Sequence, residues 1–364
     1  MIRFTVLFLF ISIANCQAQQ TVPIIQIDVS NSIVSPKFYI TGKTSSAPII
    51  DGRDDDISWQ QALFTDSFID IEGIKKAGYD TRCKMLWDDQ YLYLYARLEE
   101  DHVWGDISER DAIIYHNNDF EIFLDPEGNG GPYGEIEINA LGTVWDLMLS
   151  KPYRVHGKPI FNWNIEGLRS AVYVEGSLNT PGDTDKYWSI EMAIPMLSLT
   201  ELKSRRIKIP DEGDQWRINF SRVQWEHVIQ DGIYQRRKEN GQLKSENNWV
   251  WSPQMVINMH EPEKWGYLQF SHQENTEKVV FDRDEDELAK QILFALFREI
   301  RFGKDSFFKD KIKGEQVIIN AFYENGRSLE VAFYKTLSGF ELLFKKDDTE
   351  SLIIDQEGRL KKLK

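Results

Sequence analysis

Cysteine is scarce in this chain of 364 residues, which has only Cys16 and Cys83. Cys16 falls in an N-terminal segment of targeting character, so Cys83 is left without a disulfide partner in the mature protein. A domain of this size does not need disulfides, because it can bury a large apolar core. We therefore expect Cys83 to pack as a small apolar residue within Thr81–Trp87 and not to act as a nucleophile.

Long apolar runs are absent beyond the N-terminus, so the sequence predicts no membrane-spanning helix, which needs about 20 apolar residues. Met1–Ala18 has the pattern of a secretory signal, with Arg3 at its positive end and Val6–Ile13 as its apolar run. A small-x-small cleavage site precedes Gln19. We therefore expect the protein to be exported to a periplasmic, extracellular or cell-surface location.

A lipid anchor is the alternative outcome of the same segment, because the thiol of Cys16 could be acylated and become the mature N-terminus. Asn15 fits that processing poorly. Simple export is therefore the favoured interpretation.

Basic residues are outnumbered, with 43 Lys and Arg against 58 Asp and Glu and a formal net charge of −15. Nucleic acids and anionic membrane surfaces both require a clustered basic face. The composition therefore argues against either partner and favours neutral ligands or cations.

Long amphipathic helices are also lacking between about residues 38 and 270, where short strands alternate with Gly, Pro, Asn and Asp. This pattern predicts a mainly β fold, an antiparallel β-sandwich or jelly roll. The expected strands are Arg82–Trp87, Tyr91–Leu98, Asp119–Asp125, Gly134–Asn139, Thr143–Leu149, Ser170–Glu175, Tyr187–Pro195, Gln215–Arg222 and Trp265–Phe270.

The composition changes after Phe270 and predicts a small α+β unit at the C-terminus. We divide the chain into a signal peptide (1–18), a lead-in (19–37), the sandwich (38–270), a linker (271–283) and a helix with a β-meander (284–364). The lead-in is either a linker or an added edge strand. The predicted helix spans Asp284–Arg301, where six apolar residues recur at three- and four-residue spacing: Leu288, Ile292, Leu293, Leu296, Phe297 and Ile300. Four strand-like runs follow, with Asn325-Gly326 as one turn. A protein partner is one role open to this tail.

Three consecutive strands alternate with period two, namely Tyr91–Leu98, Asp119–Asp125 and Gly134–Asn139. In the second, Phe120, Ile122 and Leu124 face one side, and Glu121, Phe123 and Asp125 face the other. Glu135, Glu137 and Asn139 share the polar side of the third strand. Such a surface could hydrogen-bond a sugar, or it could be the solvated face of a half-exposed sheet.

Several short motifs resemble, in order and spacing, the family-9 carbohydrate-binding modules and the wider DOMON-like group of β-sandwiches. They cover roughly residues 40–270 and are Ile50-Asp51-Gly52-Arg53, Ile57-Ser58-Trp59, Lys84–Asp89 with Tyr91-Leu92-Tyr93, Asn118–Asp125, Glu137-Ile138-Asn139, Trp188–Glu191 with Ile194-Pro195, Trp216–Phe220, Trp251-Ser252-Pro253 and Trp265–Leu268. Some of them have structural explanations: Asp51-Gly52 suits a turn, and Trp59 and Trp87 suit the core.

The resemblance implies a sugar site in which an aromatic clamp cooperates with Glu, Arg, Asn and Gln side chains at a glycan chain end. Tyr115 stands at a clamp position, and Glu121 and Asn139 match the family glutamate and asparagine. Two positions depart from the pattern, because Glu137 replaces the arginine and Ser221 the glutamine. The second clamp position falls near Met259-His260, neither a good platform. Trp145, Trp163, Trp225 and Trp249 are the candidate replacements. Tyr115 could instead be a partly buried loop aromatic.

Paired carboxylates leave a glycoside hydrolase open, since Glu121 and Glu137 on adjacent strands could meet the roughly 5–10 Å spacing that such enzymes need. No nucleophile elbow, zinc-ligand spacing or phosphate loop accompanies them. Non-catalytic binding is therefore preferred, and any enzymatic activity would be hydrolysis of O-glycosyl bonds.

Haem binding is a further alternative, because relatives of this sandwich hold haem between a Met and a His ligand. Met259-His260 suggests it, as do His102, His116 and His227. Adjacent residues on a strand point to opposite faces, however, and could not both ligate one iron.

No cofactor is required by this reading, but a structural calcium ion is one interpretation of Asp125–Gly130. Asp125, Glu127 and Asn129 would be its ligands, since carboxylates and amides are the oxygen donors that Ca²⁺ prefers. The segment lacks EF-hand spacing, which favours the alternative of an acidic hairpin loop. The sequence thus predicts an exported, non-catalytic protein that binds a neutral oligo- or polysaccharide in support of polysaccharide degradation.

Overall fold

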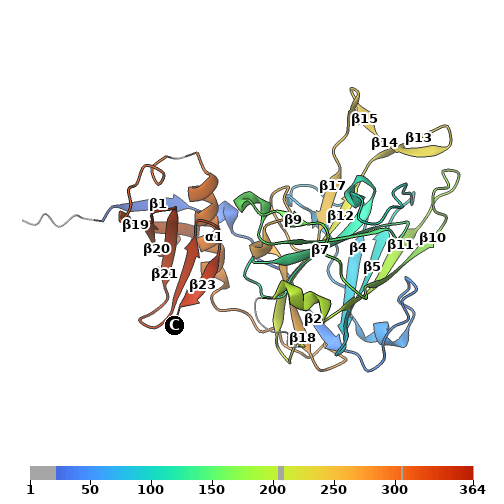
Figure 1. Ribbon diagram of the computed structural model, residues 1–364, viewed down its shortest axis with the longest axis horizontal. Helices are drawn as coiled ribbons and strands as arrows, with labels where there is room; N and C mark the ends of the chain where they lie inside the picture. Colours follow the sequence, from blue (N-terminus) through green and yellow to red (C-terminus); the bar gives the residue numbers. More distant parts are fainter. Residues whose placement is uncertain (1–21, 204–208, 305, 364) are drawn as a thin grey trace, which may run out of the picture.

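The computed structural model of the protein describes residues 22–203, 209–304 and 306–363. They form a large β lobe and a smaller lobe that contains the long helix (Figure 1). The predicted signal peptide, Cys16 and the cleavage site before Gln19 lie outside the described residues.

The large lobe is built from short strands. Its strands are β2 (Phe38–Lys43), β3 (Ile69–Asp70), β4 (Thr81–Trp87), β5 (Tyr91–Glu99), β6 (Asp119–Asp125), β7 (Tyr133–Asn139), β8 (Val144–Leu149), β9 (Pro159–Ile160), β10 (Arg169–Glu175), β11 (Tyr187–Pro195), β12 (Gln215–Gln224), β13 (His227–Gln230), β14 (Ile233–Arg236), β15 (Lys238–Glu239), β16 (Gln242–Leu243), β17 (Asn247–Val250) and β18 (Gly266–Ser271). Short 3₁₀ helices lie between some of them: η2 (Ile57–Gln61), η3 (Ile114–His116), η4 (Tyr153–Val155), η5 (Ser198–Leu202) and η6 (Pro262–Lys264). Another, η1 (Ser30–Ser32), precedes β2. The prediction of a mainly β sandwich is confirmed.

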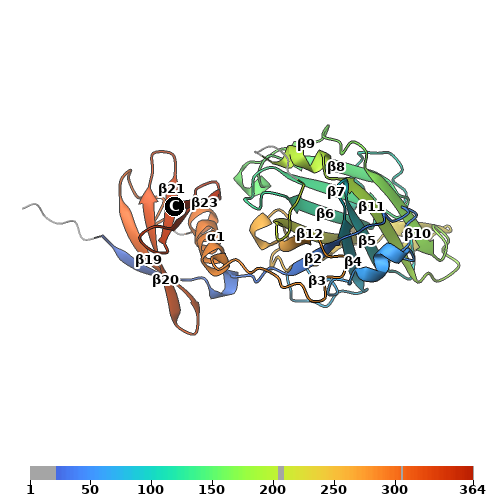
Figure 2. The same ribbon diagram turned by 90° about the horizontal axis from the view of Figure 1, so that it is seen from below.

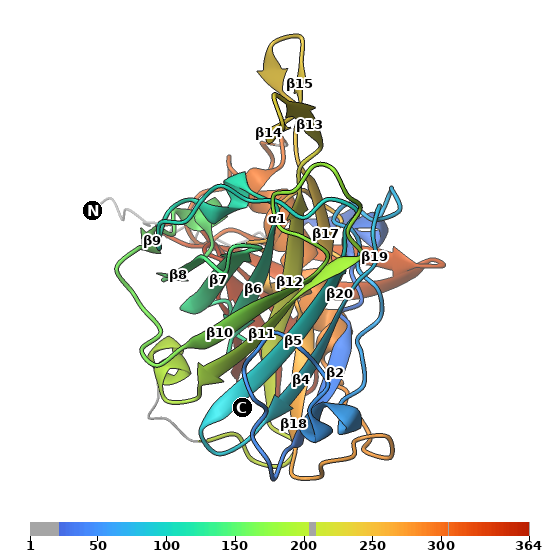
Figure 3. The same cartoon turned by 90° about the vertical axis from the view of Figure 1, so that its right-hand side faces the viewer.

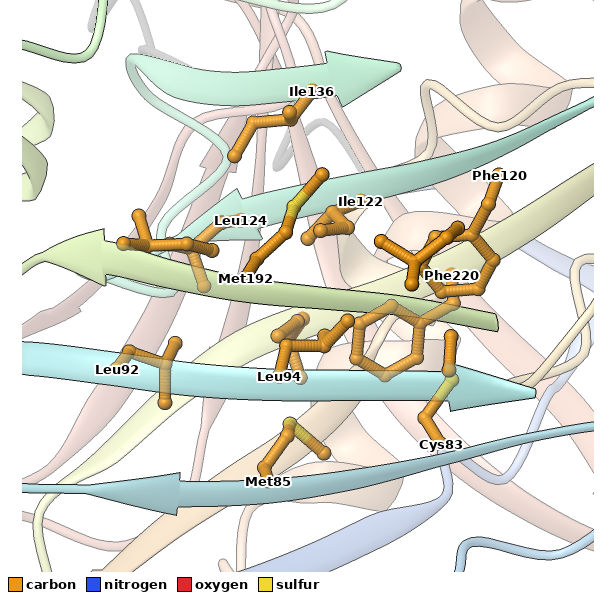
Figure 4. Close-up of a cluster of buried hydrophobic side chains, with 14 of the residues drawn as sticks. Cys83, Met85, Leu92, Leu94, Phe120, Ile122, Leu124, Ile136, Met192 and Phe220 are labelled. Atoms are coloured by element: carbon orange, nitrogen blue, oxygen red, sulfur yellow. The ribbon is translucent and has the colours of Figure 1, made fainter. Parts of the chain in front are cut away.

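The main sheet runs in the order β10-β11-β5-β4-β2-β18-β12-β6-β7-β8-β9, with β17 and β3 attached at β12. It folds back on itself, so that β4, β5 and β11 face β6, β7 and β12 across one apolar core. Figure 4 shows side chains from both layers meeting there, among them Leu94, Met192, Ile122 and Phe220. Cys83 is part of this core and fully buried, as expected.

The alternation in β6 has the predicted effect. Phe120, Ile122 and Leu124 lie in the sandwich core, whereas Phe123 packs in a second apolar cluster on the opposite face. Both β6 and β11 have the bounds that the sequence predicted.

The Asp51-Gly52 and Trp59 motifs have a structural role. The carboxylate of Glu191 accepts hydrogen bonds from the backbone N–H groups of Asp51 and Gly52, at 2.9 and 3.1 Å, and from the indole N–H of Trp59 at 2.8 Å. Gly52 has a φ of 90°, and a Cβ there would lie 2.7 Å from the backbone nitrogen of Tyr173. These residues therefore fasten the segment before η2 to the outer face of β11, and Trp59 is buried as predicted.

The small lobe contains α1 (Glu287–Phe302) and a six-stranded sheet in the order β1-β19-β20-β21-β22-β23. Its strands are β1 (Ile24–Asp28), β19 (Gln316–Glu324), β20 (Arg327–Lys335), β21 (Phe340–Lys345), β22 (Ser351–Asp355) and β23 (Leu360–Leu363). Asn325 and Gly326 both have positive φ, as the predicted hairpin turn requires. The prediction of a C-terminal α+β unit is confirmed.

In the small lobe the structure settles one open prediction, the role of the lead-in, and corrects another, the start of the apolar stripe on the helix. The lead-in is an edge strand, since β1 pairs in parallel with β19 (Figure 2). On α1 the buried face includes Ala289, Ile292 and Leu296, but Leu288 in the first turn is 42% exposed. The apolar stripe therefore begins at Ala289, one residue after the predicted start.

The two lobes are joined by a buried ionic cluster. Arg154 of η4 donates two hydrogen bonds to Glu263 of η6, at 2.8 and 2.7 Å, and Arg298 of α1 donates one at 2.6 Å. Burial alone would raise the pKa of Glu263, but the two guanidinium groups and their hydrogen bonds lower it to about 2. The interface thus holds an ionised carboxylate with its charge compensated.

Strands β13 to β16 form an arm that projects from the large lobe (Figure 3). No helix in the described ranges is long and apolar enough to span a bilayer.

Candidate functional site

A pocket of about 680 Å³ lies on the face of β6, β7 and β8 that is turned away from the sandwich core. Its lining residues come from these strands and from the loops around them: Ile71, Asp111, Ile113, Tyr115, Glu121, Phe123, Glu135, Glu137, Trp145, Leu147, Tyr153, Phe161, Val223, Glu246, Asn248, Ile257, Asn258, Met259 and His260. Three predicted site residues, Tyr115, Glu121 and Glu137, are among them.

Four buried carboxylates gather at the floor of this pocket. Asp119 and Glu121 come from β6, and Glu135 and Glu137 come from β7. Glu121 and Glu137 lie directly opposite each other in the antiparallel register. The exposed fractions of the four side chains lie between 0 and 6%. We call this group the acidic floor.

Burial raises the pKa of every carboxyl group in the acidic floor, to about 7 for Glu121. Neighbouring carboxylates add to the effect on Asp119, Glu135 and Glu137. Within the described residues no Lys, Arg or His forms an ion pair with any of these four groups, in contrast to Glu263 at the lobe interface. The floor is therefore rich in acceptors and lacks a compensating charge of its own.

Aromatic side chains form part of the pocket wall. Tyr115, Tyr153 and Phe161 are 39, 43 and 56% exposed, which is high for aromatic residues. Phe161 stacks on Trp145 with ring centroids 5.9 Å apart. Such rings offer apolar faces to a ligand at little entropic cost.

The loop that carries Tyr115 is held in place by its backbone. The N–H of Tyr115 donates to Glu137 Oε2 at 3.0 Å, and its carbonyl accepts from the indole N–H of Trp225 at 2.8 Å. One face of the loop is thus tied to the acidic floor, and the tyrosine ring is left partly exposed in the pocket.

Asn139 is placed beside the pocket and not in its lining. Its Nδ2 donates to the carbonyl of Ile107 at 2.7 Å and to Asn117 Oδ1 at 3.2 Å, and its Oδ1 accepts from the N–H groups of Leu141 and Thr143. The side chain is fully buried, with its hydrogen-bonding capacity used within the protein. This geometry fits a residue that positions the loop before Tyr115.

Ser221 of β12 lies opposite Glu121 in the sheet and is fully buried. Its hydroxyl interacts with the carboxylate of Glu121 and acts to lower the pKa of that group, and Ser221 is not part of the pocket lining. A contact between Ser221 and a sugar stays a prediction.

Of the four tryptophans considered as replacement aromatics, Trp145 lines the pocket. Trp163 donates to Glu201 and packs in the sandwich core, and Trp225 supports the Tyr115 loop. Trp249 packs against Arg222, with its ring centroid 5.1 Å from the guanidinium carbon.

Met259 and His260 both line the pocket, although the sequence argument placed adjacent residues on opposite faces of a strand. That premise was wrong, because the two residues lie in an irregular segment before η6. His260 Nδ1 is 2.8 Å from the hydroxyl of Tyr133, and burial lowers its pKa to about 4. The haem alternative stays a prediction, which the colour and absorption spectrum of the purified protein would test.

The loop after β6 was the predicted calcium site. Asp125 is fully buried, and its carboxylate accepts hydrogen bonds from the backbone N–H groups of Glu127, Gly128 and Gly130. Asn129 bonds to the Glu127 carboxylate and to the N–H of Gly131. These contacts are those of a self-capped acidic turn, so the oxygens are not arranged around an ion. Calcium binding at Asp125, Glu127 and Asn129 stays a prediction that this geometry does not favour.

The interpretation of the polar strand face as a solvated sheet surface was wrong. Loops cover it, so Glu121, Glu135 and Glu137 are buried beneath the pocket. Sequence reasoning assigned no role to Glu135 and missed Tyr153 and Phe161, which follow β8 in segments without a strand pattern. Period-two alternation did place Glu135 and Glu137 on one face, but it carries no information about covering loops.

Residues 50–201 match the family described as Carbohydrate family 9 binding domain-like. The resemblance to family-9 carbohydrate-binding modules is confirmed. The matched range contains Tyr115, Glu121, Glu137 and Asn139, and it ends before Ser221 and the small lobe. It supports a carbohydrate-binding function for the family-9-like sandwich.

Two curated relatives are similar to parts of this chain. The endo-1,4-β-xylanase C of Paenibacillus barcinonensis is 27% identical over 82 residues, which cover 22% of this chain and 7% of the relative. The exoglucanase XynX of Acetivibrio thermocellus is 22% identical over 172 residues, which cover 47% and 13%. The chain thus matches less than a seventh of the length of either relative.

Solved structures with a similar arrangement share little sequence with this chain. A family-9 module from Caldicellulosiruptor kristjanssonii in complex with cellotriose is 14% identical with a TM-score of 0.42, covering 68% of this chain and all of the module. A putative carbohydrate-binding protein from Bacteroides uniformis is 16% identical with a TM-score of 0.45, covering 65% of this chain and all of that protein.

Proposed function

We propose that this protein is an exported, non-catalytic carbohydrate-binding protein that recognises a neutral glycan at a chain end in support of polysaccharide degradation. The observation that carries the proposal is the pocket, in which exposed aromatic rings stand beside a floor of buried carboxylates. The family match over residues 50–201 supports the same class of ligand.

The pocket chemistry suits sugars. A pyranose has a face of C–H groups that desolvates well against an aromatic ring, for which Tyr115, Tyr153 and Phe161 are available. Its hydroxyls can donate hydrogen bonds to the carboxyl oxygens of Glu121 and Glu137. The sugar would thereby supply donors that the acidic floor lacks.

The charge of the pocket suggests which glycans bind. Asp111, Glu246 and three members of the acidic floor line it, whereas no Lys or Arg of the described residues does. Uronic acids would meet like charge there, which disfavours them. Glu137 adds to this selectivity, because a carboxylate accepts hydrogen bonds where an arginine would donate them.

Hydrolysis is less well supported than binding. A retaining or inverting glycosidase needs one carboxyl group held protonated and another held ionised. In the acidic floor every carboxyl pKa is raised, and the described residues offer no cation to keep one of them ionised. Incubation with xylo- and cello-oligosaccharides, followed by chromatography of the products, should show no cleavage.

A glycan array on the protein beginning at Gln19 tests the proposed function. It should include neutral xylo- and cello-oligosaccharides, uronic-acid glycans, and chains with blocked reducing or non-reducing ends. We expect binding of a neutral glycan that Tyr115→Ala and Glu121→Ala both lose, with the fold intact by circular dichroism. Phe64→Ala, an exposed aromatic variant outside the pocket, is the matched control. Absence of binding to every glycan by folded wild-type protein would contradict the proposal.

Export is tested separately by fractionating producing cells and measuring the mass of the mature N-terminus. We expect a chain that starts at Gln19 in a periplasmic, extracellular or surface fraction. An acylated Cys16 would identify a lipid anchor instead, and an intact Met1 in the cytoplasm would contradict export.

A further inference from the structure

We propose that Asp119, Glu121 and Glu137 form a binding site for a hard divalent cation at the base of the pocket, with calcium as the ion that fits best. This site is distinct from the predicted loop site at Asp125. It would supply the positive charge that the acidic floor lacks.

The geometry brings the ligands together. One carboxylate oxygen from each of the three residues lies within 4.8 Å of the others, which lets a single ion contact all three. Asp119 and Glu121 are two residues apart on the same face of β6, and Glu137 lies opposite Glu121 on β7. The strands therefore hold the ligands on a rigid frame.

Unpartnered oxygens at the site point independently to a missing ligand. Asp119 is fully buried, yet neither of its carboxylate oxygens has a hydrogen-bond partner among the described residues. The backbone N–H of Val223 lies near this carboxylate and acts to lower its pKa, against the larger effect of burial, but it does not reach hydrogen-bond geometry. Glu135 Oε2 is also buried and unpartnered among the described residues. Buried polar atoms without partners are uncommon, and an unrecorded ion is one recognised reason for them.

Charge balance leads to the same conclusion. Like charges directly opposite each other in a sheet are destabilising, and buried carboxylates are costly unless they are paired or coordinate a metal. At the lobe interface the protein compensates its buried Glu263 with Arg154 and Arg298. At the acidic floor none of the described residues plays this part, so the compensating charge must be a proton or a bound cation.

The donor set selects the kind of ion. Carboxylate and hydroxyl oxygens suit Ca²⁺, Mg²⁺ and Mn²⁺, whereas the softer metals prefer nitrogen and sulfur ligands. Ca²⁺ accepts six to eight oxygens in flexible geometry, and Mg²⁺ demands a near-ideal octahedron. Glu121 and Glu137 also line the open pocket, so water or glycan hydroxyls could complete the shell of a calcium ion. The contact between the ion and glycan hydroxyls rests on the proposed function, but the cation site itself does not.

Titration calorimetry of the full chain after removal of metal by EDTA tests the site without any glycan. CaCl₂, MgCl₂ and MnCl₂ are titrated in turn. We expect one calcium site with a dissociation constant of roughly 10⁻⁴ M or tighter, with weaker binding of magnesium. No heat of calcium binding and no rise in melting temperature with calcium would overturn the proposal.

Variants assign the calcium site. Glu137→Gln and Asp119→Asn should each weaken calcium binding about tenfold or more. Glu341→Gln, an exposed acid of the small lobe, should leave it unchanged. Glu127→Gln distinguishes the two candidate sites, because a loss of calcium affinity in this variant alone would place the ion in the Asp125 loop and contradict the proposal. Circular dichroism confirms that each variant is folded.

Glycan binding with and without EDTA separates the two proposals. Calcium binding without any glycan binding would contradict the proposed function and leave the cation site standing. Glycan binding to a protein that binds no calcium would contradict the cation site and leave the proposed function standing. If both hold, we expect EDTA to weaken glycan binding and added calcium to restore it.

Discussion

Glu121 in the pocket and Glu263 at the lobe interface are buried to almost the same degree, with 6 and 5% of each residue exposed, but they are held differently. Burial raises the pKa of Glu121 to about 7. Burial acts in the same direction on Glu263, but Arg154 and Arg298 outweigh it and lower the pKa to about 2. The difference between the two sites is therefore the presence or absence of a built-in cation.

This contrast separates a structural acid from a binding acid. Removing one partner from a buried, hydrogen-bonded ion pair leaves an uncompensated charge and costs stability. Removing a buried carboxylate that has no compensating cation removes an unfavourable charge instead. The change should then lower ligand affinity and not stability. The predictions below test this separation.

The largest effect on stability is expected at the interface. Glu263→Gln should lower the free energy of unfolding by about 3–5 kcal/mol, because Arg154 and Arg298 would lose their charged acceptor. Urea denaturation at pH 7 measures the change. A loss below about 1 kcal/mol would mean that Glu261, which lies 3.3 Å from Arg154, takes over the role.

The pH dependence of stability should reveal the contribution of Glu263. The folded pKa of Glu263 is about 2 and its ordinary value is 4.5, so the folded state binds fewer protons than the unfolded state between these values. Its contribution, on the order of 3 kcal/mol, is thus present above pH 4.5 and lost as the pH falls toward 2. Comparing wild type with Glu263→Gln across this range isolates the contribution. Parallel stability curves for the two proteins would contradict the assignment.

Asn139→Ala should have an intermediate effect, about 1–3 kcal/mol of stability, because the buried bond to Asn117 would be lost and the partly buried N–H of Thr143 would lose its acceptor. The same change should loosen the loop before Tyr115 and weaken glycan binding. Thermal unfolding and the array glycan measure the two effects. If binding fell with no change in stability, Asn139 would be a direct ligand contact, as the family resemblance implies.

Tyr153→Ala should leave stability within about 0.5 kcal/mol of wild type, because the ring is 43% exposed. Loss of the aromatic face of Tyr153 should weaken glycan binding by about tenfold, which corresponds to about 1.4 kcal/mol. Surface plasmon resonance with the array glycan, with Phe64→Ala as control, measures this. Equal losses in the two variants would show that the effect is not specific to the pocket.

Local patterns in the sequence predicted much of the fold. Period-two alternation gave the bounds of β6, the pattern of short strands between turn residues gave those of β11, and Asn325-Gly326 gave a hairpin turn. The pairing of β1 with β19 could not be predicted, because it joins residues almost 300 positions apart and neither strand records its neighbour.

The site was predictable only in part. Tyr115, Glu121 and Glu137 were identified through motifs and do line one pocket. The burial of the acidic floor was not predictable, since the loops that cover it are set by tertiary packing. Tyr153 and Phe161 gave no signal, because an exposed aromatic in a loop has the same local sequence whether or not it faces a site.

The most direct test of the account compares wild type with Glu121→Gln in two assays: urea denaturation at pH 7 in the presence of EDTA, where no cation compensates the acidic floor, and calorimetric titration with the neutral glycan selected by the array. The account predicts that the variant is as stable as wild type or more so, because a buried carboxylate without a cation is removed, while it loses most of its glycan affinity. A variant that binds the glycan as wild type does, or that is destabilised as strongly as Glu263→Gln, would show that Glu121 is a structural acid and that the pocket acids are not the binding acids proposed here.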